Sequence, residues 1–431
     1  MKIADEEVFV LKHSYNQGKC IIYAPLRSYL AQVPKEIGEV ISSTEDTLLK
    51  ATFIDRLKNQ PLLKMSDILD NLHNAVPELA IAITDNCTLR CVYCHASAGE
   101  KHKQASMSKE VVDAVLTSYF NFIGSPDVIS VNFHGGGEPT YALPLLQYTI
   151  EKAKKIADSR GIKVGFAMPT NGFYGDEVRQ FIVENFTSVS LSFDGPAFIQ
   201  NRHRPLPNGN GSFQQVFETA KYFYNRQFPF AFRATVSSFS LPHLFEIIDL
   251  IAEEFPGRSI GIESLNPFGR ALQHKDPLVE PPDKEVFGRM IVEALKYAEE
   301  KPVYVLNAAS TEYDMIRPVF CSNVGIPNWT VSINGDVIAC ARDNAPDEFV
   351  FGYFNKDTKT IVLDQKKVAN LRRMNVLNYP ECTDCFCKYQ CAGDCPDRRI
   401  DDKSDCNSIR EIGRYVLSQK LFVNSSNSKE N

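Results

Sequence analysis

The chain lacks the features of a membrane or exported protein. None of its apolar runs approaches the roughly 20 residues that a membrane-spanning helix needs. Its N-terminus, Met-Lys-Ile-Ala-Asp-Glu-Glu, is acidic and contains no apolar signal core. An excess of basic charge is also missing, since 47 Lys and Arg stand against 53 Asp and Glu, a net charge of −6. These absences predict a cytoplasmic protein and argue against a nucleic-acid partner.

Long tracts of glycine or proline are absent as well. Disorder is therefore predicted only for the polar tail, residues 424–431. The 431 residues, 44% of them apolar, exceed the roughly 250–300 residues at which a single hydrophobic core stops growing. The length predicts two or three packed domains.

Cysteine is present in an unusual arrangement, because ten of the twelve cysteines fall into two patterns. A C-x3-C-x2-C run is expected by chance only about 0.01 times in a chain of this composition. The first pattern is such a run, and the second is longer and lies in the last quarter of the chain. They consist of Cys87, Cys91 and Cys94, and of Cys321, Gly335, Cys340, Cys382, Cys385, Cys391, Cys395 and Cys406.

Thiols at gaps of two and three residues suit thiolates that converge on one iron–sulfur cube. Three thiolates, rather than four, leave one iron open to a ligand from outside the protein. Structural zinc sites also use Cys-x2-Cys spacings, and His95 offers a fourth ligand beside the first triad. The even cysteine count permits disulfides, but the spacings and the expected reducing compartment favour metal clusters.

Short apolar runs alternate with helical patterns between about residues 78 and 300. Near-continuous apolar runs are typical of parallel strands that are covered on both faces. Six such βα units predict an α/β fold with a partial (β/α)6, TIM-like barrel, whose chemistry belongs at the carboxyl ends of the strands. We expect strands at 79–84, 128–133, 163–168, 188–193, 230–236 and 259–264, and helices at 108–122, 142–158, 175–185, 212–227, 241–254 and 283–299.

Helix ends are marked by polar residues. Ser108 and Ser212 are expected to be N-caps, and Asp176 and Glu177 suit the positive end of a helix dipole.

Polar and glycine-rich motifs follow the second, third and fourth predicted strands. Glycines let the backbone approach a ligand that a Cβ would exclude, and a carboxylate can accept hydrogen bonds from an ammonium group. Each motif alone is also an ordinary strand-to-helix turn. The motifs are His134-Gly135-Gly136-Gly137-Glu138-Pro139-Thr140, Thr170-Asn171-Gly172 and Ser192-Phe193-Asp194-Gly195-Pro196.

The cysteine triad and the glycine loop together resemble the radical S-adenosylmethionine (SAM) enzymes. The resemblance implies a [4Fe–4S] cluster on Cys87, Cys91 and Cys94 whose open iron binds SAM. It also implies a set of SAM contacts: Gly136, Gly137 and Glu138 in the GGEP motif, Tyr93 on the adenine side, and Asn171, Ser192 and Arg204.

The sequence departs from this family at two positions. Family members often carry a His-Asp pair where this chain has Gln200 and Asn201, so the roles of these two residues stay open. Arg233, on the fifth predicted strand, is expected to point into the barrel mouth, where it either faces a ligand or serves as an ion-pair partner.

The second cysteine pattern resembles the SPASM/twitch extension of the same family. The resemblance implies that Cys321, Cys340 and Cys395 ligate a first auxiliary [4Fe–4S] cluster, which is left one ligand short. Cys387 either completes that set or is a bystander, and Cys20 is expected to be a small buried hydrophobic residue. The second auxiliary cluster is implied to bind Cys382, Cys385, Cys391 and Cys406.

The first 75 residues match neither pattern. Runs at 8–15 and 19–24 flank Asn16-Gln17-Gly18, which predicts a β-hairpin, and helical patterns follow at 35–41 and 47–56. This order resembles the precursor-recognition elements of enzymes that modify ribosomally made peptides, which capture a leader peptide as an added strand. The alternative is a plain cap on the barrel.

The predicted domains are an N-terminal module at 1–75, a radical SAM partial barrel at 76–305, a SPASM domain at 306–420 and a flexible tail at 421–431.

The resemblance implies an enzyme that uses a 5′-deoxyadenosyl radical, while its auxiliary clusters accept an electron or bind substrate. We expect it to modify a ribosomally made peptide oxidatively, forming a thioether or carbon–carbon cross-link. The expected partners are a precursor peptide with a leader and a flavodoxin- or ferredoxin-type electron donor, without nucleic acid or membrane. The alternatives are an anaerobic sulfatase-maturating, formylglycine-forming enzyme, a small-molecule SPASM oxidoreductase, and a non-catalytic zinc scaffold. No residue is assigned as general acid or base.

Overall fold

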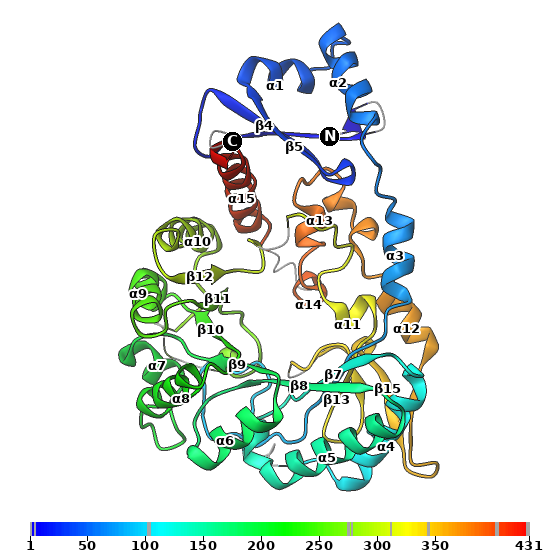
Figure 1. The fold of residues 1–431 in the computed structure, drawn as a ribbon, viewed down its shortest axis with the longest axis vertical. Helices are drawn as coiled ribbons and strands as arrows, with labels where there is room; N and C mark the ends of the chain where they lie inside the picture. The colour runs from blue at the N-terminus through cyan, green and yellow to red at the C-terminus, as the bar shows by residue number, and fades with distance from the viewer. Residues whose placement is uncertain are drawn as a thin grey trace.

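Figure 1 shows the computed structural model of the chain, which describes residues 2–3, 6–100, 105–273, 276, 279–310, 313–342, 345–400 and 405–427. Its centre is one sheet of 11 strands in the order β12-β11-β10-β9-β8-β7-β6-β13-β14-β15-β16. The strands from β6 to β12 pair in parallel, and β13 adds to β6 in parallel before the sheet turns antiparallel. The sheet is therefore continuous from the barrel into the C-terminal region.

All six predicted barrel strands are present, which confirms the α/β partial barrel. A seventh parallel strand, β12 (Val303–Leu306), pairs with β11 beyond the predicted set. The six are β6 (Leu79–Ile81), β7 (Val128–Asn132), β8 (Lys163–Thr170), β9 (Ser188–Ser192), β10 (Phe230–Val236) and β11 (Arg258–Ser264).

Six helices cover the outside of the curved parallel sheet (Figure 1), and buried aromatic side chains such as Tyr119, Phe166 and Phe223 fill the space between. A short helix, α7 (Ala197–His203), was not predicted. The six outer helices match the predicted ones: α4 (Lys109–Ile123), α5 (Leu143–Ser159), α6 (Asp176–Asn185), α8 (Phe213–Asn225), α9 (Leu244–Glu254) and α10 (Lys284–Ala298).

Both predicted N-cap positions are confirmed, but only one of the two side chains caps its helix. Ser108 Oγ accepts a hydrogen bond from Val111 N at 3.2 Å, as an N-cap should. Ser212 stands at the N-cap position of α8, but its buried hydroxyl donates instead to the carbonyl of Arg204 at 2.7 Å. Asp176 and Glu177 lie in the first turn of α6, as predicted.

The C-terminal region adds an antiparallel meander and a cysteine-rich segment. Its last helix, α15, continues to Asn427 and buries Leu421, so the predicted flexible tail is helical from 421 to 427, while 428–431 lie outside the described residues. The elements are β13 (Trp329–Val331), β14 (Val337–Ile338), β15 (Val350–Asn355), β16 (Thr360–Leu363), α11 (Ser322–Gly325), α12 (Gln365–Arg372), α13 (Lys388–Cys391), α14 (Pro396–Ile400) and α15 (Cys406–Asn427).

The N-terminal module lies above α15 and α13 in Figure 1. Its predicted hairpin is confirmed by the antiparallel pairing of β3 with β4, but a third strand, β5, and a third helix, α3, were not predicted. Cys20 is buried in β4. The elements are β1 (Lys2–Ile3), β2 (Glu6–Glu7), β3 (Phe9–Lys12), β4 (Lys19–Ala24), β5 (Tyr29–Pro34), α1 (Lys35–Ser42), α2 (Leu48–Lys58) and α3 (Met65–His73).

Short 3-10 turns occur at Pro25–Arg27, Pro139–Ala142, Leu241–His243, Gly269–Leu272, Asp347–Phe349, Val376–Asn378 and Pro380–Cys382. Within the described ranges, no helix combines the length and the apolar character needed to cross a membrane.

Candidate active site and cluster cavities

The carboxyl ends of the barrel strands open onto one cavity of about 500 Å³. Motifs that follow different strands meet there because parallel strands end at the same edge of the sheet. The structure brings together in the lining of this cavity every residue predicted for the first cluster and for SAM: Cys87, Cys91, Cys94, Tyr93, Gly136, Gly137, Glu138, Asn171, Ser192 and Arg204.

The three cysteines of the first triad lie in the loop after β6. This loop is held by backbone hydrogen bonds from Arg90 N to Pro205 O at 2.7 Å and from Val92 N to His203 O at 2.9 Å. The guanidinium of Arg270, which the sequence analysis missed, donates to Cys91 O at 2.7 Å. The loop is therefore fixed from two sides before any ligand binds.

The thiols fit an iron–sulfur cluster better than a single ion. In the part of the chain that the structure describes, no three His, Cys, Asp or Glu side chains converge closely enough to hold one metal ion. The three sulfurs of the triad therefore lie around an open space and not around a single ion position. Donors face two of the sulfurs, since Ala98 N lies 3.3 Å from Cys94 Sγ and Asn171 Nδ2 lies 3.6 Å from Cys87 Sγ.

Burial raises the pKa of the Cys87 thiol to about 12 and that of Cys91 to about 11. Thiolates therefore form here when metal replaces the protons.

The glycine loop passes very close to the triad loop. A Cβ on Gly137 would lie 1.9 Å from the carbonyl oxygen of Asn86, so only glycine fits. Backbone bonds from Gly137 N to Thr84 O at 2.7 Å and from Glu138 N to Asn86 O at 2.8 Å join the two loops. The close approach explains the glycines without reference to a ligand.

The Glu138 carboxylate is buried and joins the ends of β7 and β8. Its Oε1 accepts hydrogen bonds from the hydroxyls of Thr140 at 2.8 Å and Thr170 at 2.9 Å, and Oε2 accepts from Asn171 N at 2.7 Å. Burial raises its pKa, although these donors oppose the rise. Within the described residues Oε2 has one partner, so it retains a lone pair for the predicted ammonium group.

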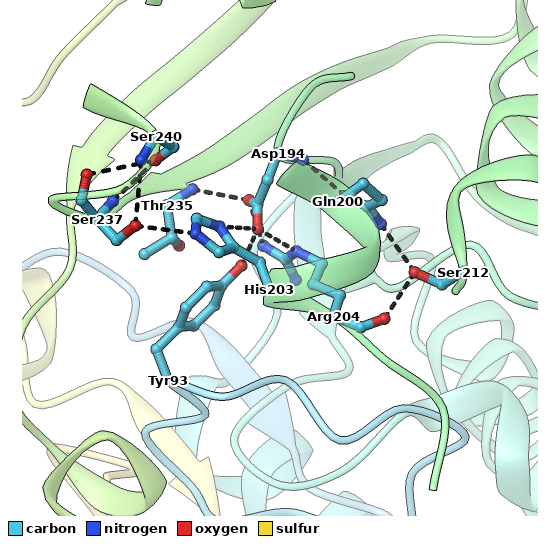
Figure 2. Close-up of polar contacts among 9 residues, drawn as sticks. All are labelled: Tyr93, Asp194, Gln200, His203, Arg204, Ser212, Thr235, Ser237 and Ser240. Atoms are coloured by element: carbon cyan, nitrogen blue, oxygen red, sulfur yellow. Dashed lines mark hydrogen bonds and ion pairs between the residues drawn. The ribbon is translucent and has the colours of Figure 1, made fainter. Parts of the chain in front are cut away.

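Asp194, in the turn after β9, is the centre of a buried polar network that Figure 2 shows. Its Oδ1 accepts hydrogen bonds from Thr235 N at 2.9 Å and Arg204 Nη2 at 3.0 Å, and its Oδ2 accepts from Arg204 Nε at 3.0 Å. The hydroxyl of Tyr93 and the ring of His203 also contact Oδ2. The predicted SAM contacts Tyr93 and Arg204 are thus fixed by one carboxylate.

The two positions that depart from the family pattern support this turn. Gln200 Oε1 accepts a hydrogen bond from Asp194 N at 2.8 Å, and Asn201 Oδ1 accepts one from Phe213 N, at the start of α8, also at 2.8 Å. In this structure their roles are to shape the turn and to begin α8.

Two further charged residues line the same cavity. Arg233 on β10 lines the cavity, as expected, and within the described ranges it forms no ion pair. Glu263, near the end of β11, was missed because no motif marks it in the sequence. Its carboxylate accepts a hydrogen bond from Ala308 N at 2.8 Å, and burial raises its pKa against the opposing charge of Arg233.

The cysteines predicted to ligate the second auxiliary cluster line a separate cavity together with Cys387. A hydrogen bond from the Cys387 thiol and a further one from Arg410 lower the pKa of Cys385 to about 6, and Arg399 Nη2 lies 3.5 Å from Cys382 Sγ. The four predicted ligands here are Cys382, Cys385, Cys391 and Cys406.

Cys321, Cys340 and Cys395, the predicted first auxiliary set, lie close enough for their charges to act on one another. Cys387 lies with the other set, and its sulfur is 3.5 Å from the hydroxyl of Tyr313. The structure thus places Cys387 away from the position that would complete the first set. Asp397 lies near Cys340 but is ion-paired with Arg342.

Two family models match the chain. Residues 81–251 match the radical SAM superfamily, and residues 321–386 match the SPASM iron-sulfur cluster-binding domain. The second match ends before Cys391, so the later ligands remain predictions.

Curated relatives extend over most of the chain. A serine-type anaerobic sulfatase-maturating enzyme of Bacteroides thetaiotaomicron is 22% identical over 353 residues, which span 74% of this chain and 82% of the relative. A cysteine-type anaerobic sulfatase-maturating enzyme of Clostridium perfringens is 24% identical over 368 residues, or 80% of this chain and 96% of the relative.

Two solved structures share the fold. Native anSMEcpe with bound AdoMet has a TM-score of 0.63 at 20% identity, and the match covers 81% of this chain and 99% of that one. Streptococcus suis SuiB bound to S-adenosylmethionine has a TM-score of 0.51 at 14% identity, and that match covers 94% of this chain and 98% of that one.

Proposed function

Because the chain carries a radical SAM domain followed by a SPASM domain, and is thus a radical SAM enzyme, we propose that it oxidatively modifies a ribosomally made peptide. The proposed product is a thioether or carbon–carbon cross-link. The observation that carries this proposal is the combination of a SAM-type cavity, two further cysteine sets and an N-terminal module of strands and helices in one chain.

Different residues of the cavity would bind the cluster and SAM. Cys87, Cys91 and Cys94 would hold the first [4Fe–4S] cluster, while Glu138 would accept the ammonium group of SAM. When bound, SAM and its cluster supply a radical that removes a hydrogen atom from an unactivated carbon. Arg233 and Glu263 also line the cavity and would orient the substrate.

The N-terminal module supports a peptide substrate. Its three-stranded sheet has β3 and β5 at the edges, and an extended leader can add to such an edge through main-chain hydrogen bonds. SuiB has been solved bound to its precursor peptide SuiA, and the SuiB match includes more of this chain than the anSMEcpe match does, 94% against 81%. A flavodoxin- or ferredoxin-type protein is the proposed electron donor.

Sulfatase maturation is the second candidate, favoured by the curated relatives of that name, whose lengths this chain covers by 82% and 96%. Native anSMEcpe has been solved with both AdoMet and the Cp18Cys peptide bound, so this candidate is also consistent with a peptide substrate. The two candidates differ in product, because formylglycine is an aldehyde and a cross-link is not.

The test is anaerobic incubation of the reconstituted enzyme with SAM, a reductant and one of two peptides. One is a candidate precursor peptide, taken from any short reading frame that lies beside the gene, and the other carries a sulfatase maturation motif with Cys or Ser. We expect the first to lose two hydrogen atoms, to remain unreactive toward an aldehyde reagent and to show a cross-link on fragmentation. If the second peptide gains an aldehyde and the first peptide is unchanged, the result would favour sulfatase maturation over this proposal.

A further inference from the structure

A buried chain of side chains lies behind the cavity wall and is not explained by the predicted SAM contacts. His203, at the end of α7, lies between Asp194 and Ser237 (Figure 2): its Nδ1 is 3.1 Å from Asp194 Oδ2 and its Nε2 is 2.9 Å from Ser237 Oγ. Neither His203 nor Ser237 is exposed at all. No motif in the sequence joins these residues, since His203 and Ser237 are 34 positions apart.

The hydrogen bonds specify how the ring is held. A carboxylate only accepts, so Nδ1–H of His203 donates to Asp194, and in the neutral ring Nε2 then accepts from the Ser237 hydroxyl. Ser240 completes the support, because Ser237 N donates to Ser240 Oγ at 3.0 Å. The ring therefore connects the turn after β10 to the Asp194 carboxylate, and the place of the turn determines where the ring holds the carboxylate.

Asp194 in turn determines where Arg204 and Tyr93 lie. Two guanidinium nitrogens of Arg204 bind the two carboxylate oxygens, a geometry that fixes orientation as well as distance. The guanidinium carbon lies 5.2 Å from the centre of the Tyr93 ring, and the His203 ring meets Tyr93 edge-on at 5.5 Å. Thr235 N holds Oδ1 and the His203 ring holds Oδ2, so without the ring the carboxylate and both side chains are held less firmly.

The same segment is attached to the cluster loop. The carbonyls of His203 and Pro205 accept hydrogen bonds from Val92 and Arg90, which flank Cys91 in the triad loop. The Arg204 charge also acts on Cys91, opposing the increase in its pKa that burial causes. Because reduction adds negative charge to a cluster, a cation held here favours the reduced form.

We propose that His203 is a positioning residue for the SAM-binding cluster: it holds Asp194 so that the Arg204 guanidinium and the Tyr93 ring stay beside Cys91. Loss of the ring contact lets the guanidinium move away from the cluster. The reduced cluster is then less stabilised, and the SAM contacts of Tyr93 and Arg204 weaken. A histidine that only fills the core would change the stability of the fold without changing either property.

The test uses the anaerobically reconstituted holoenzyme with SAM alone, so its result does not depend on the peptide proposed above. His203→Ala is expected to weaken SAM binding about tenfold, the equivalent of one lost charge-assisted hydrogen bond. Its first cluster should also have a more negative midpoint potential in a dye-mediated EPR titration. His203→Asn, which can keep the bond to Asp194, should recover most of both values.

Controls separate positioning from stability. His243→Ala removes a partly exposed histidine that pairs with Glu246, and it should leave SAM affinity and potential unchanged. If His203→Ala does not retain its iron, Ser237→Ala decides the question, because it removes only the support of Nε2 and should weaken SAM binding by about threefold. Parental SAM affinity and potential in an iron-replete His203→Ala, or in Ser237→Ala, would overturn the proposal.

Discussion

At the scale of single residues, the mouth of the barrel is arranged around a few buried charges. Asp194 is almost inaccessible to water, at 1% exposure, and an unpaired carboxylate there would be costly. Burial by itself raises the pKa of this carboxyl, but the Arg204 guanidinium and the His203 ring outweigh burial, so the pKa lies well below its ordinary 3.8. Asp194 therefore stays ionised and its pairing with Arg204 is part of the fold.

The depressed pKa predicts how Asp194→Asn changes stability with pH. A carboxyl with a lowered folded-state pKa contributes stability above its ordinary pKa, and that contribution is lost as the pH falls through the folded value. The free energy of unfolding of the parent should exceed that of the variant by about 3–5 kcal/mol. This difference should stay constant between pH 8 and 5 and should shrink below about pH 4.

The measurement is denaturant unfolding followed by the fluorescence of Trp329, the single tryptophan, which is buried in β13. Glu246→Gln, an exposed carboxylate change, is the matched control. A difference that grows toward acid pH would contradict the assignment of Asp194 as the ionised partner.

The cysteines define a second prediction at this scale. With three cubes of four irons each, the reconstituted protein should contain about twelve irons. Changing Cys87, Cys91 and Cys94 together to Ala should remove about four irons and abolish SAM cleavage, because the two other sets lie in different parts of the structure. Iron analysis and EPR check this, and a total near four in the parent would contradict the auxiliary assignment.

At the scale of elements, loops rather than strands bring the site together. The loop after β7 lies against the loop after β6 so closely that Gly137 has no room for a methyl group. Gly137→Ala should push Asn86 and the triad loop apart, costing several kcal/mol by steric overlap and reducing the iron held by the first triad. Gly175→Ala is the control, because a Cβ there meets no atom within 4 Å.

Gly137→Ala is assayed by iron content, EPR of the first cluster and thermal unfolding, each beside Gly175→Ala. An unchanged first cluster in Gly137→Ala would show that the loop can yield, and that the close approach is not required for the site.

The elements also show what the sequence can predict and where it cannot. The strand-end motifs converge as predicted because any parallel sheet places them at one edge, and this is independent of fine packing. Glu263 ends a strand too, but a single acidic residue without a motif is indistinguishable from a solvated one. Helix α3 (Met65–His73) was missed although Met65, Ile68, Leu69 and Leu72 recur at helical spacing, a signal that the sequence analysis did not use.

His203 illustrates the same limit within the site. Its partners Asp194 and Ser237 come from two different strand ends, and only the finished fold makes them neighbours. The departure at Gln200 and Asn201 was visible in the sequence, but the roles of these residues depend on where α7 and α8 lie.

At the scale of the whole molecule, the N-terminal module and the second auxiliary cavity share one core. Phe9, Ile21 and Tyr23 of the module pack with Phe386 and Cys387 beside the cysteines of that cavity. The module therefore supports the cluster region as well as carrying any peptide-binding edge.

Polar contacts also join the N-terminal module to the segment that carries the second auxiliary cysteines. Glu7 on β2 accepts hydrogen bonds from Lys388 Nζ at 2.6 Å and from the Tyr389 hydroxyl at 2.8 Å, and Gln390 Nε2 donates to the Tyr23 hydroxyl at 2.8 Å. Residues 388–390 form most of α13, whose last residue is the predicted ligand Cys391. The side chain of Lys388 is only 7% exposed, so without Glu7 its buried charge keeps only the neutral carbonyl of Thr383, at 3.2 Å, among its described hydrogen-bond partners.

We therefore expect Glu7→Gln to release the second auxiliary cluster. Removing one partner of a buried ion pair costs about 3–5 kcal/mol, and here the cost falls on the helix that carries Cys391. Iron should fall by up to about four per chain while the first cluster still cleaves SAM, and deletion of residues 1–75 should remove the full four. Iron analysis and EPR should show the loss, and Glu36→Gln, an exposed change on α1, should not. A truncated protein that keeps all its iron would mean that the module only caps the barrel and that its contacts with α13 do not hold the cluster.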